Sequence, residues 1–328
     1  MQAAWYEGFG PASEVLKTGQ IDAPEPAAGA VQVRVAASGV NPVDVKRRGG
    51  GRGDMPAARV IPHFDGAGLV TAVGDGVPAA RVGERVWFYE ANWGQAQGSA
   101  AEFTTVPAER AVPLPADMDF AAGACMGIPA LTAHRSVFAD GPVSGQTILV
   151  TGGAGSVGSY AVQFAKLAGA TVISTVSSDE KAALARKFGA AHTINYRDED
   201  VAARIMDLTD GAGVDRIVEV EFGGNLKTSI AALKVNGVIA AYASDAAREP
   251  TVPFYELVYK NIAVRHVLVF NMQETAKTDA IADIARWSAD GELQHHIGPH
   301  FPLDQIAAAH QTVESGSMGN VIVDVAAL

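Results

Sequence analysis

The sequence predicts an α/β protein in two parts, a compact barrel-like β region followed by a doubly wound parallel sheet. Three observations lead to this fold class. The chain has 328 residues, enough for about two domains of roughly 100–200 residues each. Up to about residue 115, short β-type runs alternate with glycine and proline turns. From residue 146 onward, short apolar runs alternate with helical periodicity, as they do in βαβ units.

The β region is recognised by its alternation of side chains. Residues 31–35 alternate apolar and polar side chains with a period of two, as a half-buried strand does, and 69–74 and 84–88 resemble them. Glycine clusters at 49–51 and 74–76 supply turns between such runs. The 35 glycines of the chain fit a fold with many tight turns.

Short apolar runs predict the parallel sheet, because strands that are buried on both faces lack polar alternation. Helical periodicity at 157–167 and 181–188 separates the first of these runs. The expected strands are 147–150, 171–176, 192–195, 216–220, 238–242 and 262–269. After them, a helix at 278–288, a helix near 303–315 and a strand at 320–325 form a tail that could belong to either part.

Composition excludes several classes of protein. Hydrophobic residues make up 48% of the chain and charged residues 19%, which argues against disorder. Lys and Arg number 25 and Asp and Glu number 36, so the net charge of −11 disfavours a nucleic-acid or anionic-membrane partner. The N-terminus lacks a basic segment followed by an apolar one, and no run of about 20 apolar residues could span a bilayer. We therefore expect a cytoplasmic protein.

The single cysteine, Cys125, limits the chemistry further. One thiol excludes an internal disulfide, a C-x-x-C redox pair and a multi-cysteine zinc lobe. Cys125 lies in the apolar stretch 121–126, which indicates a small core residue rather than a reactive one.

A glycine-rich turn after the first expected strand is the strongest local motif. Gly153, Gly155 and Gly158 satisfy G-x-G-x-x-G between that strand and a helix. In this arrangement the first glycine makes the tight turn, the second lets the backbone approach a pyrophosphate, and the third lets helix and strand pack closely. The helix N-terminus then offers free N–H groups to the phosphates. The motif predicts a dinucleotide-binding site.

The end of the second expected strand bears on which dinucleotide is bound. An acidic residue there would bind the ribose 2′-hydroxyl of NAD. Here Ser177 follows the strand and Lys181 comes one helical turn later, which suits a 2′-phosphate and favours NADPH. Alternatively, Ser177 and Glu180 form a capping box with Lys181 in solvent. Asp179 and Glu180 would favour NAD if the turn were placed differently.

The whole chain resembles the medium-chain dehydrogenase/reductase superfamily, and within it the zinc-free quinone oxidoreductase branch, which is the zeta-crystallin-like branch. The motifs are N-P-x-D at 41–44, D-x-A-G at 65–68, V-G-E-R-V at 82–86, G-I-P-A-L-T-A at 127–133, the glycine turn, and I-N-Y-R at 194–197. The resemblance implies a GroES-like catalytic domain (1–122 and 292–328), a Rossmann NADP-binding domain (123–291), and an active site in the cleft between them. It also implies a homodimer formed through the apolar strand 262–270, an exposed edge otherwise.

The resemblance also points to chemistry without zinc. Zinc-dependent relatives carry a cysteine where this chain has Asn41, and His63 alone lacks thiolate partners, so we expect no metal. Alcohol oxidation is difficult without a metal to hold and acidify the hydroxyl. Reduction of a quinone or an α,β-unsaturated carbonyl by NADPH needs only cofactor binding, exclusion of water and hydrogen-bond donors near the oxygen.

By similarity, Asn41 lies near the nicotinamide, although it could be an ordinary turn former before Pro42. Tyr196 joins Ser177 and Lys181 around the 2′-phosphate, or is an exposed loop aromatic. The full set of cofactor-binding residues that the resemblance implies is Asn41, Thr132, Gly153, Gly155, Ser156, Val157, Gly158, Ser177, Lys181, Tyr196, Phe222, Gly223, Ala243 and Ser244.

The proton donor to the substrate is the open question. Many relatives carry a tyrosine after N-P-x-D, and spacing puts Arg52 in its place. Arg52 could stabilise an oxyanion, or belong to a solvated loop. The catalytic candidates are Asn41, Arg52 and His63. The alternatives are an enoyl-thioester reductase, whose substrate arm Arg47, Arg48 and Arg52 could bind, and a non-enzymatic NADPH-binding regulatory or structural protein.

Overall fold

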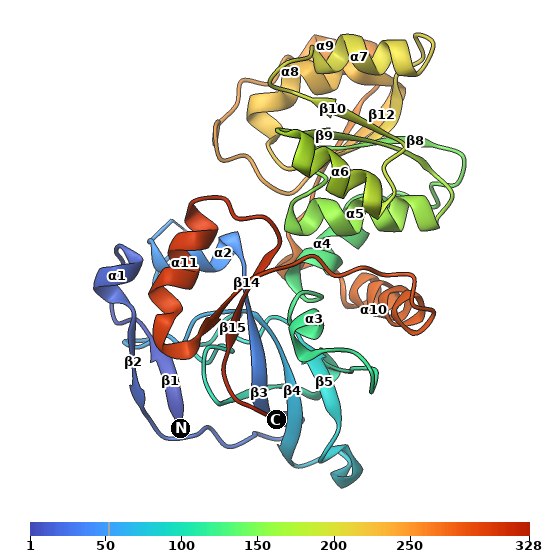
Figure 1. Cartoon of the computed structure of the whole chain (residues 1–328). Helices are drawn as coiled ribbons and strands as arrows, with labels where there is room; N and C mark the ends of the chain where they lie inside the picture. Colours follow the sequence, from blue (N-terminus) through green and yellow to red (C-terminus); the bar gives the residue numbers. More distant parts are fainter. Residues whose placement is uncertain (52) are drawn as a thin grey trace. The chain divides into compact units, whose positions relative to one another are not determined.

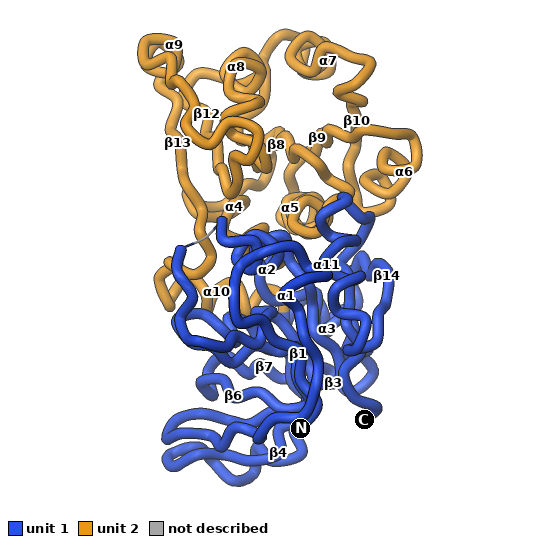
Figure 2. Tube along the Cα trace, turned by 90° about the vertical axis from the view of Figure 1, so that its left-hand side faces the viewer, with its two compact units in different colours: residues 1–129, 285–328 blue, residues 130–284 orange. Residues whose placement is uncertain are grey.

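The computed structural model describes residues 1–51 and 53–328, and the chain divides into two compact units, coloured separately in Figure 2. Unit 1 holds Met1–Pro129 and Ala285–Leu328, and unit 2 holds Ala130–Ile284. The divisions fall inside α4 (Ile128–Phe138) and α10 (Glu274–Ala289). The domain limits expected after residues 122 and 291 stay a prediction. In a sequence, a domain limit is recognised by turn residues. The divisions seen here lie inside helices, where turn residues are not expected, so the sequence does not mark them.

Unit 2, all of whose residues are described, is built on a six-stranded parallel sheet with the strand order β10-β9-β8-β11-β12-β13. This order is the 3-2-1-4-5-6 order of doubly wound dinucleotide-binding folds, with its switch point between β8 and β11. Figure 1 labels β8, β9, β10 and β12 of this sheet. The strands are β8 (Thr147–Val150), β9 (Thr171–Val176), β10 (His192–Asn195), β11 (Val214–Glu219), β12 (Leu233–Ala241) and β13 (Ala263–His266). Sequence analysis gave the first three with these same bounds.

Helices of unit 2 follow the strands and bury an apolar core against the sheet. One core cluster contains an almost fully buried side chain, at most 1% exposed, from each of four strands: Leu149, Ile173, Ile217 and Ile239. The helices are α5 (Ser156–Leu167), α6 (Asp179–Phe188), α7 (Val201–Leu208), α8 (Phe222–Ala232) and α9 (Phe254–Tyr259). The described part of the chain contains no helix long and apolar enough to cross a membrane.

The last strand is shorter than expected. The apolar run at 262–270 predicts one edge strand, but β13 ends at His266 and a short 3-10 helix (Val269–Asn271) follows. The reason is burial: Val267 and Phe270 are 6% and 7% exposed, so these apolar side chains do not lie along an open edge.

Unit 1 centres on the long strand β3 (Ala30–Val40), which pairs with β4 (Asp65–Val73), β6 and β15. Because Val321 of β15 pairs with Val40, the C-terminal tail belongs to this unit. Its other strands are β1 (Gln2–Trp5), β2 (Lys17–Gln20), β5 (Arg85–Phe88), β6 (Phe103–Pro107), β7 (Ala111–Pro113), β14 (Ile297–Pro302) and β15 (Asn320–Asp324). Its helices are α1 (Ala12–Val15), α2 (Pro42–Arg48), α3 (Phe120–Ala124) and α11 (Ile306–Glu314).

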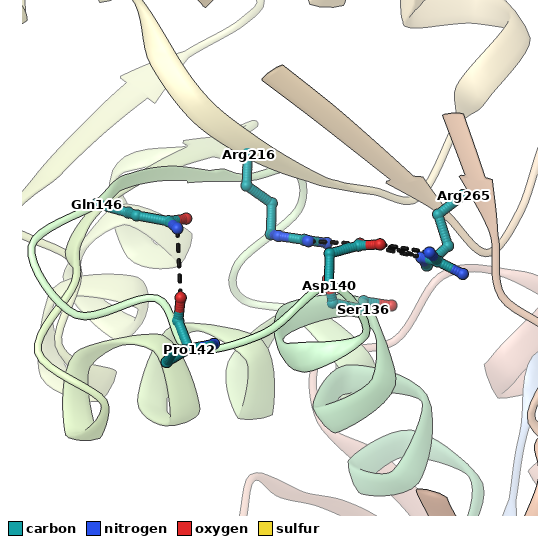
Figure 3. A network of polar contacts seen from close by, with 6 residues as sticks. All are labelled: Ser136, Asp140, Pro142, Gln146, Arg216 and Arg265. Atoms are coloured by element: carbon teal, nitrogen blue, oxygen red, sulfur yellow. Dashed lines mark hydrogen bonds and ion pairs between the residues drawn. The ribbon is translucent and has the colours of Figure 1, made fainter. Parts of the chain in front are cut away.

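An ionic cluster fixes the end of α4 to the sheet of unit 2 (Figure 3). Asp140 accepts hydrogen bonds from Arg216 of β11 at 2.6 Å and from Arg265 of β13 at 2.8 Å. Arg216 is 3% exposed and also donates to the Ser136 carbonyl at 2.9 Å. The Arg265 guanidinium is the main cause that lowers the pKa of Asp140 to about 2. The carboxylate therefore compensates a buried guanidinium, the condition under which such a pair is hardest to break.

Candidate functional site

The glycine turn lies at the switch point of the parallel sheet, directly after β8. Gly153 and Gly158 are required by close contact: a Cβ on Gly158 would lie 2.2 Å from the Gly152 carbonyl oxygen, and one on Gly153 would lie 2.0 Å from Ser174 Oγ. The left-handed backbone needed for the turn, expected at Gly153, falls instead on Gly152, whose φ is +68°. Gly152 thus takes the turn that the motif assigns to its first glycine.

Helix α5 begins at Ser156, with Gly155 as its N-cap. The first N–H groups of a helix have no partner within it, so those of Ser156, Val157 and Gly158 are suited to an anion. Gly155 is exposed while Gly158 is buried, as expected if the turn presents backbone on one side and packs on the sheet on the other. The geometry can hold a pyrophosphate.

The residues expected at a 2′-phosphate gather at the carboxyl ends of β9 and β10. Lys181 Nζ donates to Ser177 Oγ at 3.1 Å, and the Tyr196 amide donates to the Val176 carbonyl at 3.1 Å. Tyr196 is 53% exposed. The helix cap differs from the expected one: Ser178, not Ser177, caps α6 by accepting from the Lys181 amide at 3.3 Å. Ser177 is therefore left to pair with the lysine side chain.

A second group of expected residues meets at the ends of β11 and β12. The Phe222 amide donates to the Ala243 carbonyl at 2.9 Å, and the Gly223 amide donates to Ser244 Oγ at 3.0 Å. Phe222 is 7% exposed and packs in the core. Thr132, on α4, is 6% exposed.

Sequence analysis missed a buried carboxylate that holds these loops together. Glu219, at the end of β11, is fully buried and accepts from Thr151 Oγ1 at 2.9 Å, from Asn225 Nδ2 at 2.9 Å and from Ser229 Oγ at 3.1 Å. Thr151 follows β8, so this bond ties the start of the glycine turn to β11. The only signal in the sequence is an acid at the end of an apolar strand.

In unit 1, Asn41 lies at the start of α2 and is tied to two acidic residues. Its side-chain Nδ2 donates to Asp65 Oδ2 at 2.7 Å, and its backbone N–H donates to Asp44 Oδ2 at 2.8 Å. Asp65 also accepts from the Ile128 amide at 2.9 Å. The bond to Asp65 fixes the amide orientation of Asn41. A Cβ on Gly127 would lie 2.2 Å from Asp65 Oδ1, so that position requires glycine.

Burial sets the protonation of these acids. Asp44 and Asp65 are 3% and 0% exposed. Burial raises the pKa of Asp44 to about 7. Burial also raises the pKa of Asp65, and the hydrogen bond from Asn41 opposes this effect. Both residues belong to sequence motifs, N-P-x-D and D-x-A-G, which do not by themselves show that the two acids are buried. The N-x-x-D spacing of a helix cap was the available signal.

His63 is buried in unit 1 with both ring nitrogens engaged. Nδ1 lies 2.8 Å from Ser38 Oγ, and Nε2 lies 2.9 Å from Nε2 of His310. Burial lowers the pKa of His63 to about 3. His63 is thus a buried histidine with both ring nitrogens in hydrogen bonds, and a catalytic role for it stays a prediction. Arg52 lies outside the described residues.

Cys125 is fully buried, as a small core residue should be, and burial raises the pKa of its thiol. Its Sγ lies 3.2 Å from the Ala121 carbonyl oxygen. Across residues 1–51 and 53–328, no group of three or more histidine, cysteine, aspartate or glutamate side chains is placed to hold a metal ion.

Two family models match the chain. The model of the alcohol dehydrogenase GroES-like domain covers residues 27–116, and that of the zinc-binding dehydrogenase covers 156–286. A GroES-like unit and a doubly wound dinucleotide-binding sheet define the medium-chain dehydrogenase/reductase class of oxidoreductases.

Comparison with similar proteins identifies the branch of this superfamily to which the chain belongs. The quinone oxidoreductase of Rattus norvegicus is 30% identical over 322 residues, covering 97% of this chain and 95% of the relative. A 2-haloacrylate reductase of Burkholderia sp is 29% identical over 323 residues, covering 95% and 94%. The structure of Escherichia coli quinone oxidoreductase complexed with NADPH matches with a TM-score of 0.89 at 26% identity, over 99% of this chain and 100% of that one. The chain belongs to the zinc-free quinone oxidoreductase branch of this superfamily and is an enzyme of that type.

Proposed function

We propose that the protein reduces quinones or α,β-unsaturated carbonyl compounds with NADPH, by hydride transfer and without a metal. The observation that carries the proposal is the glycine turn at the switch point, combined with Ser177 and Lys181 where an NAD enzyme has an acid. The quinone oxidoreductase and 2-haloacrylate reductase relatives support a reductase of conjugated acceptors.

The residues of unit 2 fit NADPH. The backbone around Gly158 is close-packed with no room for a Cβ, and the α5 N-terminus offers its N–H groups to a pyrophosphate. Ser177, Lys181 and Tyr196 would bind the 2′-phosphate, with Phe222, Gly223, Ala243 and Ser244 near the ribose and nicotinamide. When bound, the reduced nicotinamide supplies the hydride. Asn41 and Thr132 stay predicted contacts of the cofactor.

The donor set of unit 1 does not fit zinc. Where zinc enzymes have a thiolate, Asn41 presents a neutral amide, whose nitrogen donates to Asp65 and whose oxygen lacks the negative charge that makes a thiolate a strong zinc ligand. The chain has one cysteine, and it is buried against Ala121. Reduction must then depend on donors that stabilise charge on the acceptor oxygen.

Mixing the protein with NADPH and a panel of quinones and enones tests the proposal. We expect absorbance of the reduced nicotinamide to fall with at least one of these acceptors. NADPH binding without turnover on any of them would contradict it.

The variant Lys181→Ala should lower the preference for NADPH over NADH, measured as the ratio of their kcat/KM values, by about tenfold. A charge-assisted hydrogen bond to phosphate is worth about 1.5–3 kcal/mol. Lys187→Ala, which removes an exposed lysine from the same helix, should leave the ratio unchanged. An unchanged ratio in Lys181→Ala would exclude this residue from the 2′-phosphate site.

We also propose a homodimer formed through the β13 side of the sheet. β13 is an edge strand, and nearby α9 exposes Phe254, Tyr255 and Tyr259 by 66%, 69% and 80%. Exposed edges and aromatic patches of this kind are usually covered. Light scattering at low concentration should give twice the 34.0 kDa chain mass, and a monomer would refute the proposal.

A further inference from the structure

Arg47, Phe64, Asn92 and Trp93 form a group in unit 1 that we call the Arg47 patch. The half-buried Arg47 guanidinium donates to the Asn92 carbonyl at 3.0 Å and lies 5.5 Å from the centre of the Phe64 ring. Trp93, whose ring lies 6.5 Å from that of Phe64, is 40% exposed. These contacts orient the guanidinium, and a guanidinium has five N–H donors. Most of its hydrogen-bonding capacity is therefore available to a ligand.

The charge of Arg47 is poorly compensated. In the part of the chain that the structure describes, no carboxylate lies within ion-pair distance of it. The next arginine of the same helix, Arg48, is instead buried and paired with Glu314. Asp44, three residues earlier in the helix, is close enough for Arg47 to lower its pKa, but burial outweighs this effect and raises that pKa to about 7, and Asp44 Oδ2 already accepts from the Asn41 amide. The patch is thus a guanidinium that packs on the buried Phe64 ring, with the partly exposed Trp93 ring next to Phe64.

Strained backbone borders the patch on both sides. His63 precedes Phe64 and has a φ of +76°, and Glu90 precedes Asn92 by two residues and has a φ of +56°. The Ala91 amide donates to the Phe64 carbonyl at 2.9 Å and joins the two segments. Left-handed backbone at buried non-glycine residues is costly and concentrates at functional sites. The bond between Ala91 and Phe64 connects the two segments that contact Arg47.

We propose that the Arg47 patch binds the carboxylate of a small α,β-unsaturated acid, which makes such acids the substrate class of this enzyme. This inference rests on the proposed function. A planar guanidinium matches a carboxylate with two parallel hydrogen bonds, which a lysine does not. The Trp93 ring, 40% exposed, supplies apolar surface for the flat conjugated carbons, whereas the Phe64 ring is fully buried and contacts the guanidinium. The acid named for the Burkholderia relative, a 2-haloacrylate, has this chemistry.

Arg47 also has a role in the reaction of such an acid. A hydride added to the β-carbon breaks the C=C π bond, and its electron pair moves onto the α-carbon and the carboxylate oxygens. Those oxygens then carry a second negative charge, which the guanidinium stabilises more than the single charge of the ground state. A proton from water completes the saturated acid, while NADPH is oxidised to NADP⁺.

The test compares 2-chloroacrylate with its methyl ester, which share the double bond and differ in charge. We expect the wild type to have the higher kcat/KM on the acid. Arg47→Met should lower the acid-to-ester ratio of kcat/KM by about tenfold or more, since that factor corresponds to about 1.4 kcal/mol, at the low end for a charged hydrogen bond. Arg47→Lys, which keeps the charge and loses the fork, should lie between the two.

Arg59→Met is the matched control. Arg59 also lies over an aromatic ring, 4.9 Å from the centre of Trp5, and pairs with Glu7. Its loss changes the net charge equally and should leave the ratio unchanged. Binding of the saturated 2-chloropropionate, measured by isothermal titration calorimetry, gives a readout without turnover. Its Kd should rise about tenfold in Arg47→Met and stay constant in Arg59→Met.

Several results would overturn the inference. One is a higher kcat/KM of the wild type on the ester than on the acid. Another is an equal fall of kcat/KM on acid and ester in Arg47→Met. A third is a variant in which only the KM for NADPH rises. A preference for an enoyl-coenzyme A that Arg47→Met abolishes would assign the patch to a phosphorylated arm instead. Reduction of quinones without reduction or binding of the acids would refute this inference alone. No NADPH oxidation with any acceptor would refute the proposed function.

Discussion

Replacing Asp65 with alanine should lower the free energy of unfolding of unit 1 by about 3 kcal/mol, because it strands two buried donors. Asn41 Nδ2 and the Ile128 amide both bond to this carboxylate at 2.7–2.9 Å. Each buried donor that loses its acceptor costs about 1–3 kcal/mol. Relief of the repulsion between Asp65 and Asp44 offsets part of that loss. Urea unfolding followed by tryptophan fluorescence measures it, and all four tryptophans lie in unit 1.

Two variants make the result interpretable. Asp65→Asn keeps an oxygen for the Ile128 amide, so it should lose about 1 kcal/mol, the usual net worth of one hydrogen bond. Asp75→Ala removes an exposed aspartate of the same unit and should change stability by no more than about 0.5 kcal/mol. If Asp65→Ala unfolded at the wild-type urea concentration, the network would not stabilise the unit.

The parts of the fold that sequence analysis predicted well are those governed by local pattern. The strands at 147–150 and 171–176 are buried along almost their whole length, so their composition marks their ends. The edge strand at 192–195 is only partly buried, and the alternation of strands with helices placed it. The glycine turn was found from local pattern as well, because a turn, a close approach and a helix start each need a particular residue at a fixed spacing. The cap of α6 was expected at Ser177 but lies at Ser178. Local pattern cannot choose between two adjacent serines, because either hydroxyl could cap the helix.

The parts that were missed depend on contacts between distant segments. Asp65 receives hydrogen bonds from residues 24 and 63 positions away, and only the folded unit shows that three separate motifs meet there. The apolar run at 262–270 reads as one strand because periodicity cannot tell a buried coil from an edge strand. His310 had no recognisable motif, yet it lies 2.9 Å from His63 across 247 residues.

The His63–His310 pair has a direction that can be deduced from its surroundings. Ser99 donates to the Asp65 carbonyl, so Ser38 must donate to Ser99, 2.6 Å away. Ser38 then accepts from Nδ1–H of His63, and Nε2 of His63 accepts from Nε2–H of His310. The second bond has this direction because burial keeps both histidines neutral, which leaves Nε2 of His63 without a proton. Burial lowers the pKa of His63 to about 3 and also lowers the pKa of His310, which Arg48 depresses further.

Acid should consequently destabilise unit 1 through these two residues. Below the ordinary histidine pKa of about 6.5, the unfolded chain binds protons that the folded chain does not. The stability that the pair contributes is complete above pH 6.5 and is lost as the pH falls, for His63 at about 1.4 kcal/mol per pH unit until about pH 3. Asp44 acts with the opposite sign: its raised pKa makes stability fall as the pH rises from about 3.8 to about 7.

A variant without the two histidines separates their effect on stability from that of Asp44, because Asp44 titrates in both the wild type and the variant. We expect the double variant His63→Asn/His310→Gln to lose stability less steeply than the wild type between pH 6.5 and pH 4.5, by at least about 1.4 kcal/mol per pH unit. Asparagine suits the left-handed backbone at position 63, where φ is +76°. His192→Gln, at an exposed histidine, should keep the wild-type slope. Equal slopes in the wild type and the double variant, measured by urea unfolding at each pH, would mean that the folded pair takes up protons as readily as the unfolded chain.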